Sequence, residues 1–188
     1  MGDADYMLAF HRIVLPIAYD FKPDLVVISA GFDSGLGDPL GGCRITPEGY
    51  AHMTHMLMGL AEGKVAVVME GGYNLRTISR SFAACARVLK GGAPPPLHEP
   101  TCRPCSAAMY AVTQTQLTLA EYWPALRMMG MRSAGGMDVG AIPGMSDTSD
   151  DGDFDMANGK PPEHTRHVDR ACIVTACVEP LSCCHGVV

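Results

Sequence analysis

Acidic side chains and a tyrosine stand in two glycine-rich segments that each follow an apolar run. Asp33 and Asp38 lie in "AGFDSGLGDPLGG", directly after "DLVVIS", and Glu70 and Tyr73 lie in "EGGYNL", directly after "KVAVVM". An aspartate has a short stem that suits a zinc ligand in a narrow cleft. A tyrosine beside two glycines is suited to donate a hydrogen bond to a developing oxyanion. On residue types alone, these side chains are therefore candidates for a zinc ligand and for an oxyanion donor in one shared site.

Each of these residues also has a purely structural interpretation. An aspartate in a glycine-rich loop most often accepts hydrogen bonds from its own backbone, and a tyrosine after two glycines often packs at an edge. In open α/β sheets, however, sites form at the carboxyl ends of the strands. The two segments share a site only if both apolar runs are strands of one parallel sheet.

The surrounding pattern predicts such a sheet. Leu25 to Ala30 and Lys64 to Met69 are short apolar runs rich in β-branched residues, which is typical of strands buried in a parallel sheet. Helical periodicity lies before, between and after them. Strands joined by helices imply right-handed crossovers. The expected fold class is therefore α/β, with a parallel sheet and flanking helices.

Helix boundaries are marked by capping residues. Asp3 or Asp5 can cap a helix that runs to residue 21, with a kink expected at Pro16. Thr46 and Asn74 are expected to cap two later helices. The expected helices cover residues 3–21, 46–63, 75–90 and 107–129, and Thr113 and Gln116 allow the last one to begin late or break.

The 188 residues are 47% hydrophobic, which is enough for one domain with a core. The net charge of −6 argues against direct nucleic-acid binding, which depends on an excess of Lys and Arg. The sequence has no apolar run of the length, about 18 residues, that a membrane span needs. The first ten residues lack the basic and apolar regions of a signal peptide. The expected location is therefore the cytoplasm, the nucleus or both.

Residues 130–188 form a segment of different composition. It is rich in Gly, Pro, Ser and Asp and then in Cys, and it is predicted to be disordered. The domain boundary is accordingly expected at residue 129. Four of the eight cysteines lie in this tail, and Cys102 and Cys105 have C-x-x-C spacing. No second pair stands at zinc-ribbon distance, so free thiols are the simpler interpretation.

Several long motifs carry a resemblance to a known family. "GDADY", "HRIVLPIAYDFKPDLVVISAGFD", "GDPLGG", "TPEGYAHMTHMLMGLA" and "MEGGYNL" together resemble the zinc-dependent histone deacetylases, and most of all their class IIb, tubulin-deacetylase-like branch. The likeness runs from residue 1 to about residue 97 and continues more weakly to residue 127. It implies the carboxyl-terminal part of an arginase-like deacetylase domain.

The resemblance implies a role for each matching residue. Asp38 matches the family's last zinc ligand, and Tyr73 matches the tyrosine that donates to the amide oxygen of acetyl-lysine. Asp33 matches a structural position that binds loop amides. Gly71 and Gly72 match residues that line the acetyl-lysine tunnel. Ile45, "I" in "CRIT", falls where the family has an apolar residue near the tunnel mouth.

The family's site also requires an Asp-x-His pair of zinc ligands and a His-His dyad that serves as general base and acid. Neither pattern occurs in this sequence. His52 and His55 have i, i+3 spacing on one helix, but the family does not use these positions. One zinc ligand without a base does not activate water. The chain alone is therefore expected to bind no zinc and to have no appreciable deacetylase activity.

Three hypotheses remain open from the sequence. The chain is part of a lysine deacetylase that acts on an acetylated protein of histone or tubulin type once the missing half is present. Alternatively, it is a non-catalytic module that binds a full deacetylase or another partner. In the third hypothesis it is one half of a split enzyme, and a separate chain carries the Asp-x-His and His-His elements. A two-stranded sheet would leave open edges, so a partner or a rearranged core is expected.

Overall fold

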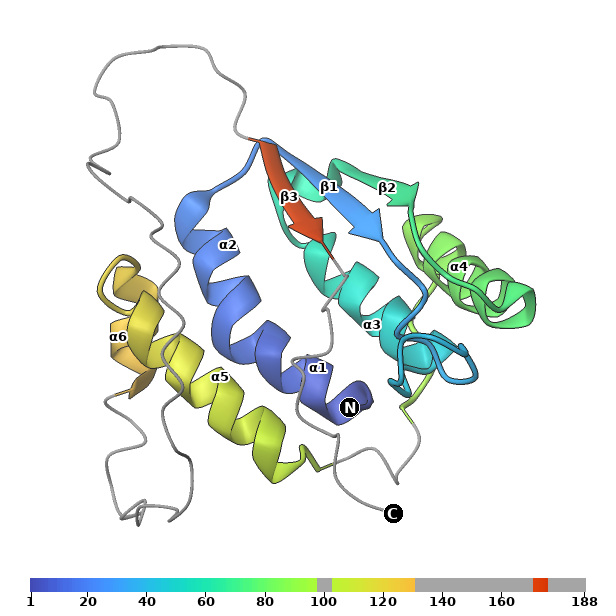
Figure 1. The fold of residues 1–188 in the computed structure, drawn as a ribbon. Coiled ribbons are helices and arrows are strands. Elements are labelled where there is room, and N and C mark those ends of the chain that lie inside the picture. Colours follow the sequence, from blue (N-terminus) through green and yellow to red (C-terminus); the bar gives the residue numbers. More distant parts are fainter. Residues whose placement is uncertain (98–102, 131–170, 176–188) are drawn as a thin grey trace, which may run out of the picture.

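The computed structural model describes residues 1–97, 103–130 and 171–175 of the chain (Figure 1). Within these ranges, no helix is both long and apolar enough to cross a membrane. The elements in chain order are α1 Asp3–Ala9, a π-helical segment Phe10–Val14, α2 Leu15–Phe21, β1 Leu25–Ala30, α3 Pro47–Leu57, a 3₁₀ turn Ala61–Gly63, β2 Val65–Met69, α4 Leu75–Leu89, α5 Ser106–Leu119, α6 Pro124–Gly130 and β3 Ala171–Thr175.

The three described strands form one parallel sheet in the order β2-β1-β3. In its register Val26 lies beside Val65 on one side, and Leu25 lies beside Ala171 on the other. The predicted parallel α/β sheet is therefore confirmed. Because β1 and β2 run the same way, the loops that follow them leave the sheet at the same end.

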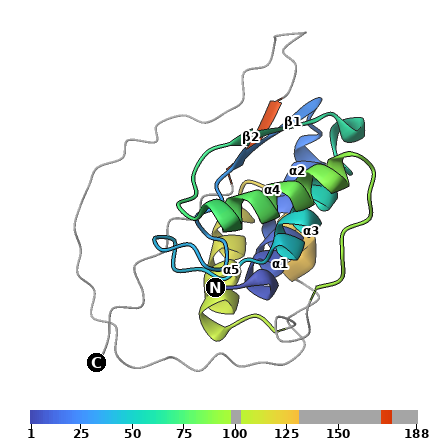
Figure 2. The ribbon, with the colours of Figure 1, turned by 90° about the vertical axis from the view of Figure 1, so that its right-hand side faces the viewer.

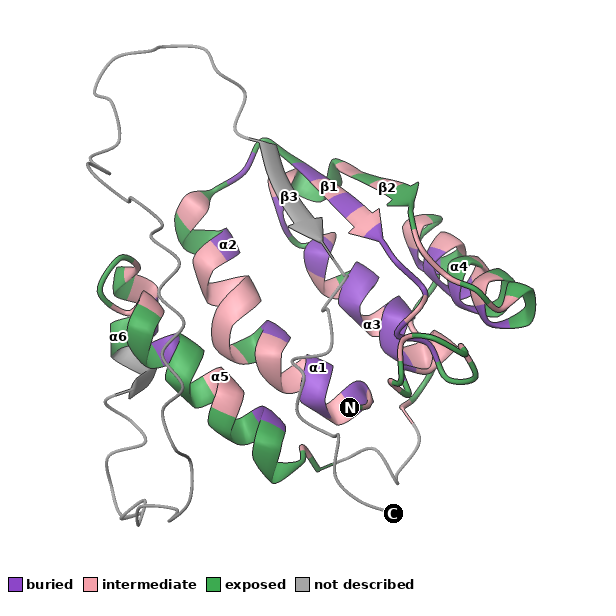
Figure 3. Cartoon of the chain, in the orientation of Figure 1, coloured by how far each residue is buried: buried purple, intermediate pink, exposed green. Residues whose placement is uncertain are grey.

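The core lies between the sheet and the helices on one of its faces. Val26 and Ile28 of β1 are buried and pack with Tyr50 and Leu57 of α3. Of the alternate β1 residues, Leu25 is exposed and Val27 and Ser29 are half-buried, and Ala66 and Val68 of β2 are exposed. Figure 2 draws the described helices below the sheet, and Figure 3 shows the exposed positions along β2. One sheet face is thus covered and the other is largely open in the described part of the chain.

The first predicted helix is helical throughout Asp3–Phe21 but contains the π-helical segment. That segment ends just before Pro16, which has no N–H to donate to the preceding turn. The N-cap is Gly2, and Asp5 accepts the Gly2 N–H through Oδ2 at 2.7 Å. The prediction that Asp3 or Asp5 is the N-cap is therefore wrong, because both lie within the first turn: Asp5 accepts the N–H of the N-cap Gly2, and Asp3 turns into the core.

Two predicted boundaries differ from the structure. The predicted helix over 107–129 is two helices, α5 and α6, because Pro124 begins a new helix after a break at residues 120–123. The second predicted helix ends at Leu57 and not at Gly63, and a tight turn with positive φ at Ala61 and Glu62 follows it. The capping predictions for Thr46 and Asn74 are confirmed by their hydrogen bonds to the first turns of α3 and α4.

The predicted disorder of residues 130–188 is wrong for β3. Ala171–Thr175 is a strand that pairs with β1 along five positions. The backbone N–H and C=O groups of this strand form hydrogen bonds with β1. This stabilisation comes from a segment far away in the sequence, so the local composition does not reveal it. The remaining residues from 131 to 188 lie outside the described part of the chain, as does Cys102. Cys43, Cys85 and Cys105, which are described, are free thiols, as predicted.

Candidate functional site

The two glycine-rich loops meet at the carboxyl ends of β1 and β2. The Tyr73 backbone N–H donates to Asp38 Oδ2 at 2.7 Å, although the two residues are 35 positions apart in sequence. The loops are adjacent because their strands are neighbours in a parallel sheet. The structure thus brings together the aspartate and the tyrosine that the sequence placed in one hypothetical site.

Backbone amides surround the Asp38 carboxylate. In addition to Tyr73, the N–H of Leu40 donates to Oδ1 at 2.9 Å and the N–H of Gly41 donates to the same atom at 3.3 Å. Partial burial alone would raise the pKa of Asp38, but the amides of Leu40, Tyr73 and Gly41 outweigh it and lower the pKa below its usual value. Asp38 is therefore a carboxylate at neutral pH.

The Tyr73 ring stands at the surface beside this carboxylate. It is 60% exposed, so its hydroxyl is accessible to a molecule that approaches the loops. The backbone N–H of Tyr73 is fixed by its bond to Asp38, while the residue is largely exposed. The arrangement provides a fixed carboxylate and a tyrosine hydroxyl that can turn toward a ligand.

Asn74 joins the two loops in a way that the sequence did not reveal. Its Oδ1 caps α4 by accepting the N–H groups of Arg76 and Thr77 at 3.0 and 3.2 Å. Its Nδ2 donates to the Gly37 carbonyl oxygen at 2.7 Å, next to Asp38. The Thr77 hydroxyl adds a bond to the Leu36 carbonyl oxygen at 3.0 Å. The sequence indicated the cap, but the second bond depends on how the loops meet.

Replacement of Asn74 should separate these two roles. Asn74→Ala is expected to lower the free energy of unfolding by about 1–2 kcal/mol, because it removes both the cap and the bond to Gly37. Asn74→Ser keeps a capping oxygen but cannot reach Gly37, so its loss should be smaller. In both variants the Tyr73 amide should exchange faster with solvent deuterium. An unchanged exchange rate in Asn74→Ser would mean that the bond to Gly37 does not hold the loops together.

The two glycines before Tyr73 allow close approach to the loop that follows β1. Gly72 has φ +134°, and a Cβ there would lie 2.7 Å from Ile78 Cγ1. The Gly71 carbonyl oxygen accepts the Phe32 N–H at 2.8 Å, and a Cβ on Gly71 would lie 3.1 Å from Asp33 Oδ2. Both positions therefore favour glycine for structural reasons. Their role as tunnel residues remains a prediction.

Ile45 does not join the other predicted site residues. Its side chain is fully buried in the core cluster with Phe32 and Tyr50. The Ile45 N–H donates to the Ser34 carbonyl oxygen, and the Ile45 carbonyl oxygen accepts the Leu36 N–H. These bonds join the loop after β1 to the segment just before α3. In the described part of the chain Ile45 therefore acts as a packing residue. Its predicted position near a tunnel mouth stays a prediction.

Asp33 has the structural role predicted for it. Its Oδ1 accepts the Ser34 backbone N–H at 3.0 Å. The Ser34 hydroxyl in turn shares a 2.7 Å hydrogen bond with the Tyr50 hydroxyl inside the core. Burial raises the pKa of Tyr50, so this hydroxyl stays protonated at neutral pH. These contacts anchor the first half of the loop while Asp38 stays at its outer end.

The described residues do not fit a zinc ion at Asp38. Among them, no group of three or more His, Cys, Asp or Glu side chains could hold a metal ion. Both Asp38 oxygens already accept backbone amides, and a catalytic zinc site requires three protein ligands. His52 Nε2 lies 2.8 Å from the Pro95 carbonyl oxygen and not near Asp38. The described chain therefore supplies one carboxylate of such a site.

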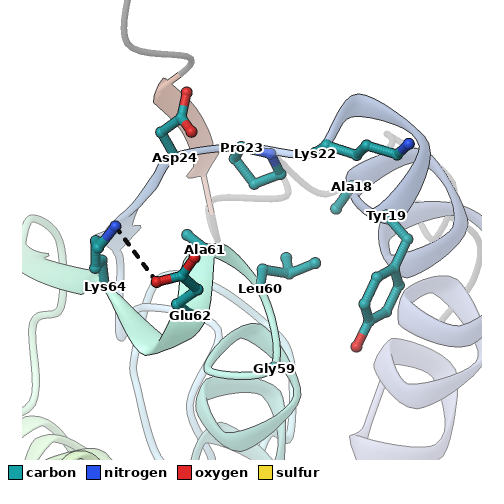
Figure 4. A pocket seen from close by; sticks show the side chains of 10 residues that line it. All are labelled: Ala18, Tyr19, Lys22, Pro23, Asp24, Gly59, Leu60, Ala61, Glu62 and Lys64. Atoms are coloured by element: carbon teal, nitrogen blue, oxygen red, sulfur yellow. Dashed lines mark ion pairs between the residues drawn. The ribbon is translucent and has the colours of Figure 1, made fainter.

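A pocket of about 220 Å³ lies elsewhere (Figure 4). Its lining includes Pro23 and Asp24 before β1 and Lys64 before β2. Lys64 Nζ is 3.8 Å from Glu62 Oε2, but both side chains are exposed and the pair contributes little. The pocket is at the amino ends of the strands, opposite Asp38 and Tyr73. It is therefore not part of the candidate site.

Comparisons with known proteins agree on one family. Residues 1–89 match the histone deacetylase domain. Histone deacetylase clr3 of Schizosaccharomyces pombe is 49% identical over 127 residues, which are 68% of this chain and 18% of that protein. Polyamine deacetylase HDAC10 of Homo sapiens is 40% identical over 162 residues, which are 86% of this chain and 22% of that protein.

Solved structures show the same relationship. The structure of the histone deacetylase Clr3 superposes with a TM-score of 0.66 at 48% identity. The match covers 68% of this chain and 21% of the Clr3 chain. The crystal structure of the HDA15 HD domain gives a TM-score of 0.64 at 46% identity. The match covers 70% of this chain and 36% of the HDA15 chain. The chain belongs to the histone deacetylase domain family and has a partial arginase/deacetylase-like fold. It spans about a fifth of the length of the curated relatives it matches.

Proposed function

We propose that this chain supplies the Asp38 and Tyr73 part of a zinc-dependent lysine deacetylase site, which is not active in the chain alone. The observation that carries the proposal is the 2.7 Å contact between the Tyr73 amide and the Asp38 carboxylate. In this role the accessible Tyr73 hydroxyl donates a hydrogen bond to the amide oxygen of acetyl-lysine. Asp38 is the residue that would contact zinc if further ligands were present. No step through zinc is assigned to this chain, because its described residues do not complete the site.

The finer parts of the proposal rest on sequence resemblance. The motifs favour the class IIb branch, although the fungal, plant and human relatives all lie between 40 and 49% identity. The proposed substrate is an acetylated lysine of histone or tubulin type, bound after the missing half is supplied by the same or a separate polypeptide. The acidic net charge favours a protein substrate over direct contact with nucleic acid. The proposed location is the cytoplasm, the nucleus or both.

The purified chain gives the first test. We expect zinc far below one ion per chain and no release of acetate from an acetyl-lysine peptide above the rate without protein. Tyr73→Phe is the matched control, since it removes only the hydroxyl. Turnover that requires both added zinc and the Tyr73 hydroxyl would contradict the proposed inactivity and would show that ligands and a base come from other residues of this chain.

A chimera tests the positive half of the proposal. The matching 127 residues of the S. pombe clr3 protein are replaced by the corresponding segment of this chain. We expect the chimera to deacetylate the peptide, Tyr73→Phe to reduce its kcat by about 10²–10³-fold, and Asp38→Ala to abolish zinc-dependent turnover. A folded chimera whose activity is unaffected by both substitutions would refute the proposed roles.

The alternative is a non-catalytic module that binds a longer deacetylase or another protein. The observation that favours it is the engagement of both Asp38 oxygens by backbone amides, which leaves the carboxylate satisfied without a metal. The two proposals differ in the chimera. A binding module predicts a folded but inactive chimera, whereas a site-bearing segment predicts an active one.

A further inference from the structure

One side of α4 carries basic side chains and no acidic ones. Residues 75–90, which are α4 and its C-cap residue, contain no Asp or Glu. Their cationic side chains are all exposed: Arg76, Arg80, Arg87 and Lys90. The spacings of four, seven and three residues follow the turns of the helix, so these side chains form one stripe. At a rise of about 1.5 Å per residue, this α4 stripe is about 21 Å long.

The α4 stripe is separate from the side of the helix that packs on α3. Ala84 and Val88, on that packed side, are buried against Ala51 of α3. Figure 2 shows α4 on the side of the molecule that faces the viewer, and Figure 3 shows buried and exposed positions alternating along it. Among the residues that the structure describes, no ion pair involves a cation of α4, although the net charge of the chain is −6.

The stability of α4 itself does not account for the α4 stripe. Arg76 lies in the first turn, where the positive end of the helix dipole disfavours a cation. Arg76 and Arg80 have i, i+4 spacing, at which like charges repel. Natural chains break such local rules mainly where a functional surface requires it. Charged side chains are rarely buried unless they are paired, so in a longer protein only an acidic surface is suited to cover the stripe.

We propose that the α4 stripe binds an extended acidic segment of a partner protein. Alternate side chains of an extended segment point the same way and lie about 6.6 Å apart. Four such carboxylates therefore span about 20 Å, which matches the stripe within the reach of its long side chains. The guanidinium groups of Arg80 and Arg87 are suited to hold carboxylates through two parallel hydrogen bonds. The inference uses neither Asp38 nor Tyr73, so it stands or fails separately from the proposed function.

Two other anionic occupants are less suited to the α4 stripe. Nucleic acid carries phosphates that would pair with the same cations, but the net charge of −6 opposes its approach. The chain also has an acidic run of its own, which consists of Asp147, Asp150, Asp151, Asp153 and Asp155. In that run only Asp151, Asp153 and Asp155 alternate without a gap, so an extended form presents three adjacent carboxylates to four cations.

Binding of a labelled peptide to the full chain tests the proposal. The probe has about twelve residues in which Glu alternates with Ser, and the control peptide has Gln in place of Glu. We expect the Glu peptide to bind with a Kd of micromolar order, the Gln peptide not to bind, and about 0.5 M salt to raise the Kd about tenfold or more.

Matched double variants locate the binding surface. Arg80→Ala/Arg87→Ala should raise the Kd for the Glu peptide about tenfold or more, while Arg80→Lys/Arg87→Lys keeps the charges and should be intermediate. Lys22→Ala/Lys64→Ala removes two exposed lysines at the amino ends of the strands and should leave the Kd unchanged. Circular dichroism verifies folding, which the alanines should preserve because they favour a helix.

Four results would each overturn the proposal. The first is an equal Kd for the wild-type chain and the Arg80→Ala/Arg87→Ala variant. The second is a DNA duplex that binds through the same arginines more tightly than the peptide. The third is a Kd that falls about tenfold when the five aspartates of residues 147–155 become Asn, since that run would then be the occupant. The fourth is a folded clr3 chimera that does not bind the peptide, because the longer domain would then cover the stripe.

Discussion

Phe32→Ala is expected to lower the free energy of unfolding by about 3–5 kcal/mol, which is typical of losing a fully buried aromatic side chain. Phe32 is 0% exposed at the start of the loop that carries Asp38. Its ring lies 5.0 Å from the Tyr50 ring and 6.1 Å, edge to face, from the Phe82 ring. The cavity is not easily refilled, since the backbone on both sides is fixed by hydrogen bonds to Gly71 and Gly35.

Urea unfolding followed by circular dichroism measures this loss. Phe82→Ala is the matched control, because the Phe82 ring contacts Phe32 but is 38% exposed and should cost only about 1 kcal/mol. Phe32→Leu should fall between the two. Equal losses for Phe32→Ala and Phe82→Ala would show that Phe32 is not the anchor of the loop.

Asp3→Ala is expected to cost about 3 kcal/mol. The Asp3 carboxylate is fully buried and accepts the Thr46 backbone N–H at 2.8 Å and the Thr46 hydroxyl at 2.6 Å. Hydrogen bonds to a charged group contribute about 1.5–3 kcal/mol, and their removal leaves buried donors without a partner. This contact joins the start of α1 to the start of α3, so its loss should also loosen the N-cap at Thr46.

Thermal and urea unfolding measure the effect, with two comparisons. Asp20→Ala removes an exposed carboxylate from α2 and should change the free energy of unfolding by less than about 0.5 kcal/mol. Asp3→Asn keeps an acceptor oxygen for one of the two donors and should be intermediate. If Asp3→Ala were as mild as Asp20→Ala, the buried contact with Thr46 would have no energetic role.

The predictions from sequence succeeded where the determining physics is local. The caps at Thr46 and Asn74 follow from side chains that reach N–H groups two or three residues away. The strands β1 and β2 follow from apolar β-branched runs bounded by turn residues. The meeting of Asp38 and Tyr73 could also be predicted, because parallel neighbours end at the same edge.

Features that depend on contacts between distant segments could not be predicted from the sequence in this way. β3 pairs with β1 from a region whose composition indicates disorder, and five residues carry too little local pattern to outweigh it. Ile45 is apolar in either role, so only the packing of the loop decides between core and tunnel mouth. The Asn74 bond to Gly37 and the Asp5 bond to the Cys105 N–H join residues far apart in sequence.

The pairing of β1 with β3 has a consequence for how the chain is made. Leu25 lies beside Ala171, so the partners are 146 positions apart (171 − 25) and their contact closes a very long loop. At a synthesis rate of about 5–20 residues per second, β1 leaves the ribosome roughly 7–30 s before β3. During that interval this edge of β1 is exposed while β2 and the helices form. During this interval Leu25–Ala30 therefore offers an unpaired apolar edge to chaperones that bind nascent chains.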